Sequence, residues 1–404
     1  MAALLDALLL RSGYNAALVA IGAALLGSAA GAVGTFLYLR KRALVADAIT
    51  HATLPGICLA FMGLTALGLD GRNLSALLAG AAVSAGMGLV AVEWMTRRTR
   101  LGEDAAIGAV LSVFFGLGVV LLTVIQAMSQ GRQAGLQGFL LGSTAGMLYS
   151  EALLIAAGGS AAVVAVVTLR RPMTFVAFDA EHASAIGIDV RAVDFAMMGL
   201  VMAITVIGLK VVGLILIVAL LIIPPVSARF WSEQSDRIVI AAAALGAAAG
   251  YVGAALSVTA PKLPTGALIV LFSAALFVLS LLLAPARGVV ATLLRRQRFR
   301  KAVHLRQGLL SLAHRERILD GLTLSVLRRR GFIRRDGVAT ERGLKAAAEA
   351  LRNERRWDIA RELHRTELAT SELIGLAPID TVLTRDEVAA IDRRLALSGS
   401  KGVA

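Results

Sequence analysis

Long apolar segments follow one another through the first 285 residues of this 404-residue chain, and they constrain its fold more than any other feature. A helix needs about 20 residues to cross the hydrocarbon core of a bilayer, where every backbone polar group must be satisfied within the protein. The hydrophobic content of 57% and the charged content of only 17% fit this pattern. The sequence therefore predicts an all-α polytopic membrane protein.

Nine segments are candidate membrane spans. They cover residues 14–39, 44–68, 74–96, 105–126, 138–169, 193–209, 211–229, 237–257 and 266–284. Reading 193–229 as one long helix instead gives eight spans. With nine spans and the N-terminus outside, the clusters of Lys and Arg all fall in inner loops, as the positive-inside rule expects. We therefore predict about nine transmembrane helices and keep eight as the alternative.

The positive charge is concentrated in the C-terminal tail. Residues 285–404 hold 25 Lys/Arg and 14 Asp/Glu, and the whole chain has a formal net charge of +14. A basic domain attached to a membrane protein can face the anionic cytoplasmic leaflet, bind nucleic acid or simply be soluble. The sequence predicts two domains: a transmembrane domain at 1–288 and a basic cytosolic domain at 289–404.

The second predicted span carries two ionisable side chains. The basic triplet 40–42 precedes it, Asp47 and His51 lie near its start, and Pro55 interrupts it. Ionisable groups inside a membrane segment are costly and indicate a pathway or a site by default. Residues i and i+4 share a helix face, and carboxylate and imidazole both suit first-row divalent ions, so the pair could hold one ion. Alternatively, Asp47 caps a helix and His51 is an interior imidazole. Cys58, the only cysteine, is interpreted as a small packing residue.

A polar interval, Phe178–Arg191, separates two spans on the predicted inner side. Its pattern predicts a short amphipathic helix that is closed by Gly187, with Asp179 and Glu181 in the first turn, where the helix dipole favours acidic groups. The interval is either an interfacial loop or a helix that docks into a cytosolic partner.

A proline pair, Pro224-Pro225, ends the apolar run that begins at Gly208. Proline removes a backbone donor and breaks a helix, which is tolerated in a membrane where protein or a cavity satisfies the freed groups. The pair therefore predicts a broken helix near the inner mouth of a pathway, or a helix end at the membrane interface.

These stretches together resemble the permease subunits of bacterial ATP-binding-cassette (ABC) importers for zinc, manganese and iron. The matching stretches are RKR…DAITHATLPG from Arg40, LGEDAAIG from Leu101, FDAEHA…GI from Phe178, VVGLILIVALLIIPP from Val211 and PTG from Pro264. They cover roughly residues 12–285 in the family's order. One departure is the proline pair itself, because the family usually has Pro-Ala there.

The resemblance implies a permease in the bacterial cytoplasmic membrane that moves Mn, Zn or Fe as a divalent ion into the cytoplasm and has no permanently bound cofactor. It implies three kinds of partner: a second permease subunit, identical or paralogous; two cytosolic ATPase subunits; and an extracytoplasmic metal-binding protein. The chain itself is then not an enzyme, and it contains no G-x-x-x-x-G-K-[ST] motif. Asp47 and His51 fall on the family's metal-site pattern. The loop that contacts the ATPase falls on Phe178, Asp179, Glu181, His182 and Gly187.

The basic tail has the pattern of a small, mostly helical domain. Ile318–Arg330 is helical by pattern, and Asp336-Gly337 predicts a hairpin turn like that of a winged-helix wing. The stretches 353–360 and 379–388 resemble iron-dependent-repressor-type metalloregulators. The segment before the wing is short for a complete helix-turn-helix. The stretch 371–380, where such regulators have metal ligands, contains no histidine. These two departures argue against DNA binding and metal sensing, so the tail is interpreted as serving subunit contact or regulation. The alternative for the whole chain is a membrane-tethered regulator on a transport-inactive permease scaffold.

Overall fold

The structure is a computed structural model, and it describes residues 2–71, 73–127, 147–260, 263–363 and 378–400. The chain divides into two compact units, Met1–Ala291 and Thr292–Ala404.

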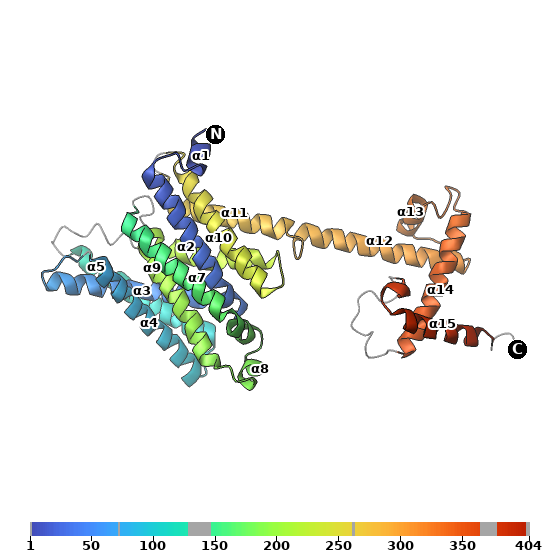
Figure 1. The fold of residues 1–404 in the computed structure, drawn as a ribbon, viewed down its shortest axis with the longest axis horizontal. Helices are drawn as coiled ribbons and strands as arrows, with labels where there is room; N and C mark the ends of the chain where they lie inside the picture. The colour runs from blue at the N-terminus through green and yellow to red at the C-terminus, as the bar shows by residue number, and fades with distance from the viewer. Residues whose placement is uncertain (1, 72, 128–146, 261–262, 364–377, 401–404) are drawn as a thin grey trace. The chain divides into compact units, whose positions relative to one another are not determined.

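The first unit is a bundle of helices (Figure 1). Its helices are α1 (Ala2–Leu8), α2 (Tyr14–Leu39), α3 (Ala43–Ala66), α4 (Leu74–Arg98), α5 (Glu103–Ala127), α7 (Tyr149–Phe178), α8 (Ala180–Ala185), α9 (Val190–Arg229), α10 (Ser235–Ser257) and α11 (Thr265–Leu283). Within the described residues, eight helical segments are long and apolar enough to cross a membrane. The first part of the span expected at 138–169 lies outside the described residues.

Helix α9 decides the number of spans. Gly213 has φ 78° and ψ 172°, a conformation that glycine adopts readily and other residues avoid, and it interrupts the helix. Val190–Leu209 is long enough to span, whereas the apolar helix Leu216–Arg229 is shorter. At 1.5 Å per residue the second helix covers roughly 20 Å of a hydrocarbon core about 30 Å thick. By helix length, the described part of the chain agrees with the alternative of eight spans, and nine stays a prediction.

The helix break expected at Pro224-Pro225 is not found there. Helix α9 continues through both prolines to Arg229. Pro225 has no N–H for the carbonyl of Leu221, four residues earlier. That carbonyl lies against Gly34 of α2, where an added Cβ would be only 2.0 Å from the oxygen. Such a close approach permits a Cα–H···O contact in place of the missing helical bond. The backbone departs from helical geometry at Gly213 instead.

Helix α2 is buried along most of its length and packs closely against α10. At their crossing, a Cβ added to Gly27 would lie 2.2 Å from the Gly246 carbonyl, and one added to Gly246 would lie 2.1 Å from the Gly27 carbonyl. Small residues of this kind allow two membrane helices to approach until their backbones touch.

We therefore expect Gly246→Ala to destabilise the bundle by about 1–3 kcal/mol, because the methyl group has no space unless the helices separate. Thermal unfolding in detergent or nanodiscs measures this effect. The matched control is Gly116→Ala in α5, where an added Cβ meets nothing within 4 Å. Equal melting temperatures for the two variants would contradict the proposed close contact.

The second unit has two small cores. Its helices are α12 (Val289–Ala313), which begins just before the unit boundary, α13 (Gly321–Arg329), α14 (Glu341–Leu363), the 3₁₀ helix η4 (Ile379–Thr381) and α15 (Arg385–Ser400). One core contains Leu309, Leu327 and Ile333, and the other surrounds Trp357 and Ile391, both fully buried.

The turn predicted at Asp336-Gly337 is present. Ile333 and Ala339 form an antiparallel bridge, Gly337 has φ 87°, and Asp336 accepts a hydrogen bond from the N–H of Val338. This bridge is the only β-structure among the described residues, so the winged-helix assignment remains a prediction. The helix expected at Ile318–Arg330 corresponds to α13.

Candidate metal site and coupling segment

Asp47 and His51 lie one turn apart on α3, as their spacing predicts. The Nε2 atom of His51 is 3.3 Å from Oδ1 of Asp47. The side chains are 24% exposed for His51 and 35% exposed for Asp47, so both remain reachable in the single chain although the helix around them is mostly buried. The pair therefore presents one carboxylate and one imidazole nitrogen toward the same point.

The imidazole of His51 is held by its surroundings. Its ring meets the ring of Phe115 on α5 edge-on, with centroids 4.9 Å apart and an interplanar angle of 81°. Its Nδ1 atom is buried and makes no hydrogen bond to any described residue. Nε2 is thus the nitrogen that faces Asp47, and it is the one available to a cation.

The interruption expected at Pro55 is absent, because α3 continues through this residue to Ala66. Pro55 has no N–H to donate to the carbonyl of His51, four residues earlier, so this oxygen lacks its helical partner. Cys58 is buried, and its Sγ lies 3.8 Å from the Gly118 carbonyl. This position agrees with the interpretation of Cys58 as a packing residue.

Two protein ligands make a weak site. Among the described residues, no group of three or more His, Cys, Asp or Glu side chains could hold a metal ion. A divalent transition metal takes four to six ligands, so an ion at Asp47–His51 needs water or a second protein chain to complete its coordination.

A buried ion pair lies at the link between α2 and α3. Arg40 directly follows α2 and binds Asp194 on α9 through two hydrogen bonds. Its Nε donates to Oδ1 at 3.2 Å, and its Nη2 donates to Oδ2 at 3.2 Å. Its Nη1 donates to the Val176 carbonyl on α7 at 3.0 Å. Asp194 is only 7% exposed. Arg40 therefore joins the end of α7 and the start of α9, the two helices on either side of α8.

Arg42, at the N-terminus of α3, extends this network. Its Nε donates to Glu103 of α5 at 2.9 Å. Its Nη1 is 4.0 Å from carboxylate oxygens of both Glu93 and Asp194, is buried, and makes no hydrogen bond to a described residue. The two arginines thus connect four helices, α4, α5, α7 and α9, to the link between α2 and α3.

The interval between α7 and α9 folds as its sequence predicts, into the short helix α8. Asp179 caps it by accepting from the N–H of His182 at 2.9 Å, and Gly187, with φ 87°, follows its end. Glu181 lies in the first turn, and only Ala183 of the helix is buried. Phe178, the last residue of α7, is 61% exposed. The segment therefore presents an apolar ring, two acidic groups and an imidazole at the surface of the described chain.

Residues 14–284 match the profile of the ABC 3 transport family. The chain belongs to this family. It is 38% identical over 298 residues to the manganese transport system membrane protein MntC of Bacillus subtilis, a match that covers 74% of this chain and 67% of the relative. It is also 38% identical over 287 residues to the zinc transport system membrane protein TroC of Treponema pallidum, covering 71% and 95%.

Among solved structures, PsaBC from Streptococcus pneumoniae in complex with a Fab resembles this ABC 3 chain with a TM-score of 0.61 and 28% identity. The match covers 71% of this chain and 97% of the other. The family match ends just before α12, so it includes the Asp47–His51 pair, the Arg40 network and α8 but leaves out the second unit.

Sequence reasoning missed the Arg40–Asp194 pair. The two residues are 154 positions apart, and Asp194 is buried beside Arg40. One signal was present: a carboxylate inside an apolar segment needs a partner, and the basic triplet 40–42 is predicted on the same inner side.

Proposed function

We propose that this chain is the membrane subunit of an ATP-driven importer that moves a divalent transition metal, manganese, zinc or iron, into the cytoplasm. The Asp47–His51 pair carries this proposal, because it sets two suitable ligands side by side within a membrane span of the family region. The names of the manganese and zinc transport relatives support the class of cargo. ATP hydrolysis is supplied by a partner chain.

The weakness of the two-ligand site fits transport. An ion must bind well enough to enter and loosely enough to leave. A second permease subunit, identical or paralogous, would supply two further ligands if the pathway lay between the two chains. His51 is about 12 Å along the helix from the start of α3 at Ala43, so the pair is a waypoint within the membrane. An extracytoplasmic metal-binding protein would make the first capture.

The exposed α8 segment is the proposed contact for the two cytosolic ATPase subunits. Phe178, Asp179, Glu181, His182 and Gly187 form this surface. A short helix between two spans can insert into a partner as a rigid unit, and only Ala183 of α8 is buried.

Arg40 is the proposed link between α8 and the metal pair. It binds the Val176 carbonyl before α8 and the Asp194 carboxylate after it, and the α2–α3 link leads from Arg40 directly into α3. A movement of α8 would therefore be carried to the helix that holds Asp47 and His51. We treat Arg40 as a positioning residue, since it does not touch the metal pair.

The proposal is tested by reconstituting the permease in vesicles with its ATPase and binding protein and measuring uptake of radiolabelled Mn²⁺, Zn²⁺ and Fe²⁺. We expect uptake of at least one metal that depends on ATP. Glu181→Lys, which reverses a charge on the exposed face of α8, is expected to lower ATP-driven uptake and weaken ATPase binding while leaving the melting temperature unchanged.

Uptake that persists without the ATPase would indicate an ion-driven carrier and contradict the proposal. Absence of uptake for all three metals, with a transcriptional response that disappears when residues 289–404 are deleted, would favour the membrane-tethered regulator. Unchanged ATPase binding in Glu181→Lys would remove α8 as the docking segment without affecting the assignment of the metal pair.

A further inference from the structure

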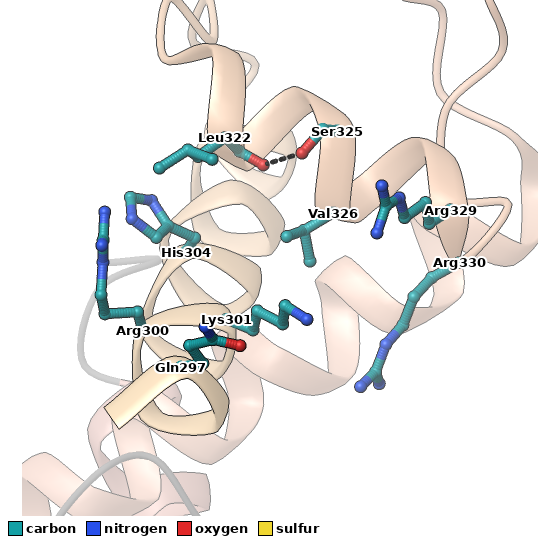
Figure 2. Close-up of a pocket in the computed structure, with 9 residues that line it drawn as sticks. All are labelled: Gln297, Arg300, Lys301, His304, Leu322, Ser325, Val326, Arg329 and Arg330. Carbon is teal, nitrogen blue, oxygen red and sulfur yellow. Dashed lines mark hydrogen bonds between the residues drawn. The ribbon is translucent and has the colours of Figure 1, made fainter. Parts of the chain in front are cut away.

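A basic cleft lies in the second unit between α12 and α13 (Figure 2). Its volume is about 420 Å³, within the range of small-molecule sites. One wall is the middle of α12, which contributes Arg300 and Lys301. The other is α13, with Arg329 at its end and Arg330 directly after it. The cleft lies outside the region that matches the ABC 3 transport family.

The four cations of the cleft lack carboxylate partners among the residues that the structure describes. No ion pair in the described part of the chain engages Arg300, Lys301, Arg329 or Arg330. Other arginines of the same unit are paired: Arg306 with Glu354, Arg356 with Asp392 and Asp380, and Arg361 with Asp358 and Glu354. No lining residue is acidic. The cleft therefore has a net positive charge that no lining residue neutralises.

The cleft also has an apolar surface. Leu322 is 50% exposed there, and Val326 lies one turn further along the same face of α13. In Figure 2 the Ser325 hydroxyl, also part of the lining, donates to the backbone carbonyl of Leu322 at 2.8 Å. A ligand that covers the apolar surface needs an apolar part in addition to its negative charge.

The nearest carboxylate is already engaged. Asp320 caps α13 by accepting from the N–H of Thr323 at 2.8 Å and from its hydroxyl at 2.6 Å, and it lies 3.0 Å from Nδ1 of His304. These hydrogen bonds, with a smaller contribution from the nearby imidazole, lower the pKa of Asp320, so it remains a carboxylate directed at its own cap. Because Nδ1 of His304 is used in this way, its Nε2 atom is the one left for a ligand.

The two walls are fixed relative to each other. Leu309 of α12 and Leu327 of α13 belong to one buried core. A Cβ added to Gly308 would lie 2.6 Å from the Thr323 side chain, so the helices meet closely beside the cleft. Ordering a ligand here therefore requires little rearrangement of the protein, which favours binding.

We propose that this cleft binds a ligand in which two or more phosphate groups are joined to an apolar group. Arginine and lysine from two directions suit phosphate oxygens, and Leu322 with Val326 suits a base or a hydrocarbon part. Two sources share this chemistry: a soluble nucleoside diphosphate or triphosphate, and an anionic phospholipid whose headgroup contains two phosphates.

The test uses the full chain without its ATPase partner, in nanodiscs of neutral lipid, titrated with fluorescent ADP. Arg300→Glu and Lys301→Glu are each expected to weaken binding about tenfold or more, since a charge-assisted hydrogen bond is replaced by repulsion. The matched control is Arg298→Glu, an exposed arginine of the same helix that does not line the cleft, with an expected change below about twofold. Arg329→Gln tests the opposite wall in the same assay.

A second arm distinguishes the sources. Phospholipid retained after delipidation is measured by mass spectrometry for the wild type and for the same variants. Binding of ADP in neutral nanodiscs supports a soluble ligand, and retention of anionic lipid by the wild type and the control only supports a headgroup. The proposal is wrong if neither probe binds, or if Arg298→Glu weakens binding as much as the cleft variants do. The proposal is also wrong if duplex DNA binds the chain and the cleft variants and Arg298→Glu weaken that binding equally, because general charge attraction would then explain it.

Discussion

Replacing His51 with alanine is expected to lower ATP-driven metal uptake by about 100-fold or more, and Asp47→Ala is expected to have a similar effect. Each chain offers the ion only these two side chains within the described residues, so either substitution removes half of its protein ligands. Loss of a group that merely orients a metal ligand typically lowers affinity about 10–100-fold, and loss of the ligand itself should cost at least as much. Initial uptake rates in reconstituted vesicles measure the effect.

Folding should not be affected by these two changes. The side chains are 24% and 35% exposed, so their removal leaves no fully buried partner. We expect melting temperatures close to that of the wild type, with a change in stability of about 0.5 kcal/mol or less. Thr65→Ala on the same helix is the control, because its hydroxyl donates to the Phe61 carbonyl of its own helix at 2.8 Å. A His51→Ala permease that transports like Thr65→Ala would refute the assignment.

Arg40→Ala is expected to destabilise the bundle by about 3 kcal/mol and to uncouple ATP hydrolysis from uptake. It leaves the Asp194 carboxylate buried without its guanidinium and removes the donor to the Val176 carbonyl. Breaking a buried ion pair costs about 3–5 kcal/mol, and the low end applies here because the Arg40 side chain is 21% exposed. Asp194→Asn should give a smaller loss in the same direction.

A second ion pair provides the comparison. Arg170 and Asp236 lie 3.3 Å apart but are 45% and 60% exposed, so Arg170→Ala should cost no more than about 1 kcal/mol. The double variant Arg40→Met with Asp194→Leu should recover part of the stability, since no buried charge is left alone, while ATP-driven uptake stays low. If Arg40→Ala unfolds no more easily than Arg170→Ala, the buried pair does not have the role we give it.

Local features of the fold could be predicted from sequence because local rules decide them. The 14–39 span is α2 to the residue, since its apolar run ends at the basic triplet. The α8 segment was predictable from an acidic first turn and a glycine at its end. The approach of Asp47 and His51 follows from helical spacing alone.

Features that depend on distant contacts could not be predicted in this way. The break in α9 falls at Gly213 and not at the proline pair, because the Leu221 carbonyl that Pro225 frees is met by Gly34, which is far away in sequence. The same limit applies to Arg40 and Asp194: periodicity shows that each is unusual, but only packing shows that they are partners.

The most direct test of the metal assignment is the X-ray absorption spectrum of Zn²⁺ bound to the purified permease. We expect imidazole nitrogen in the first shell at about 2.0–2.1 Å, together with carboxylate oxygen. The imidazole signal should be absent from His51→Ala and retained in Thr65→Ala. A first shell that is the same in the wild type and in His51→Ala would show that the ion binds elsewhere, and the proposed pathway through α3 would be wrong.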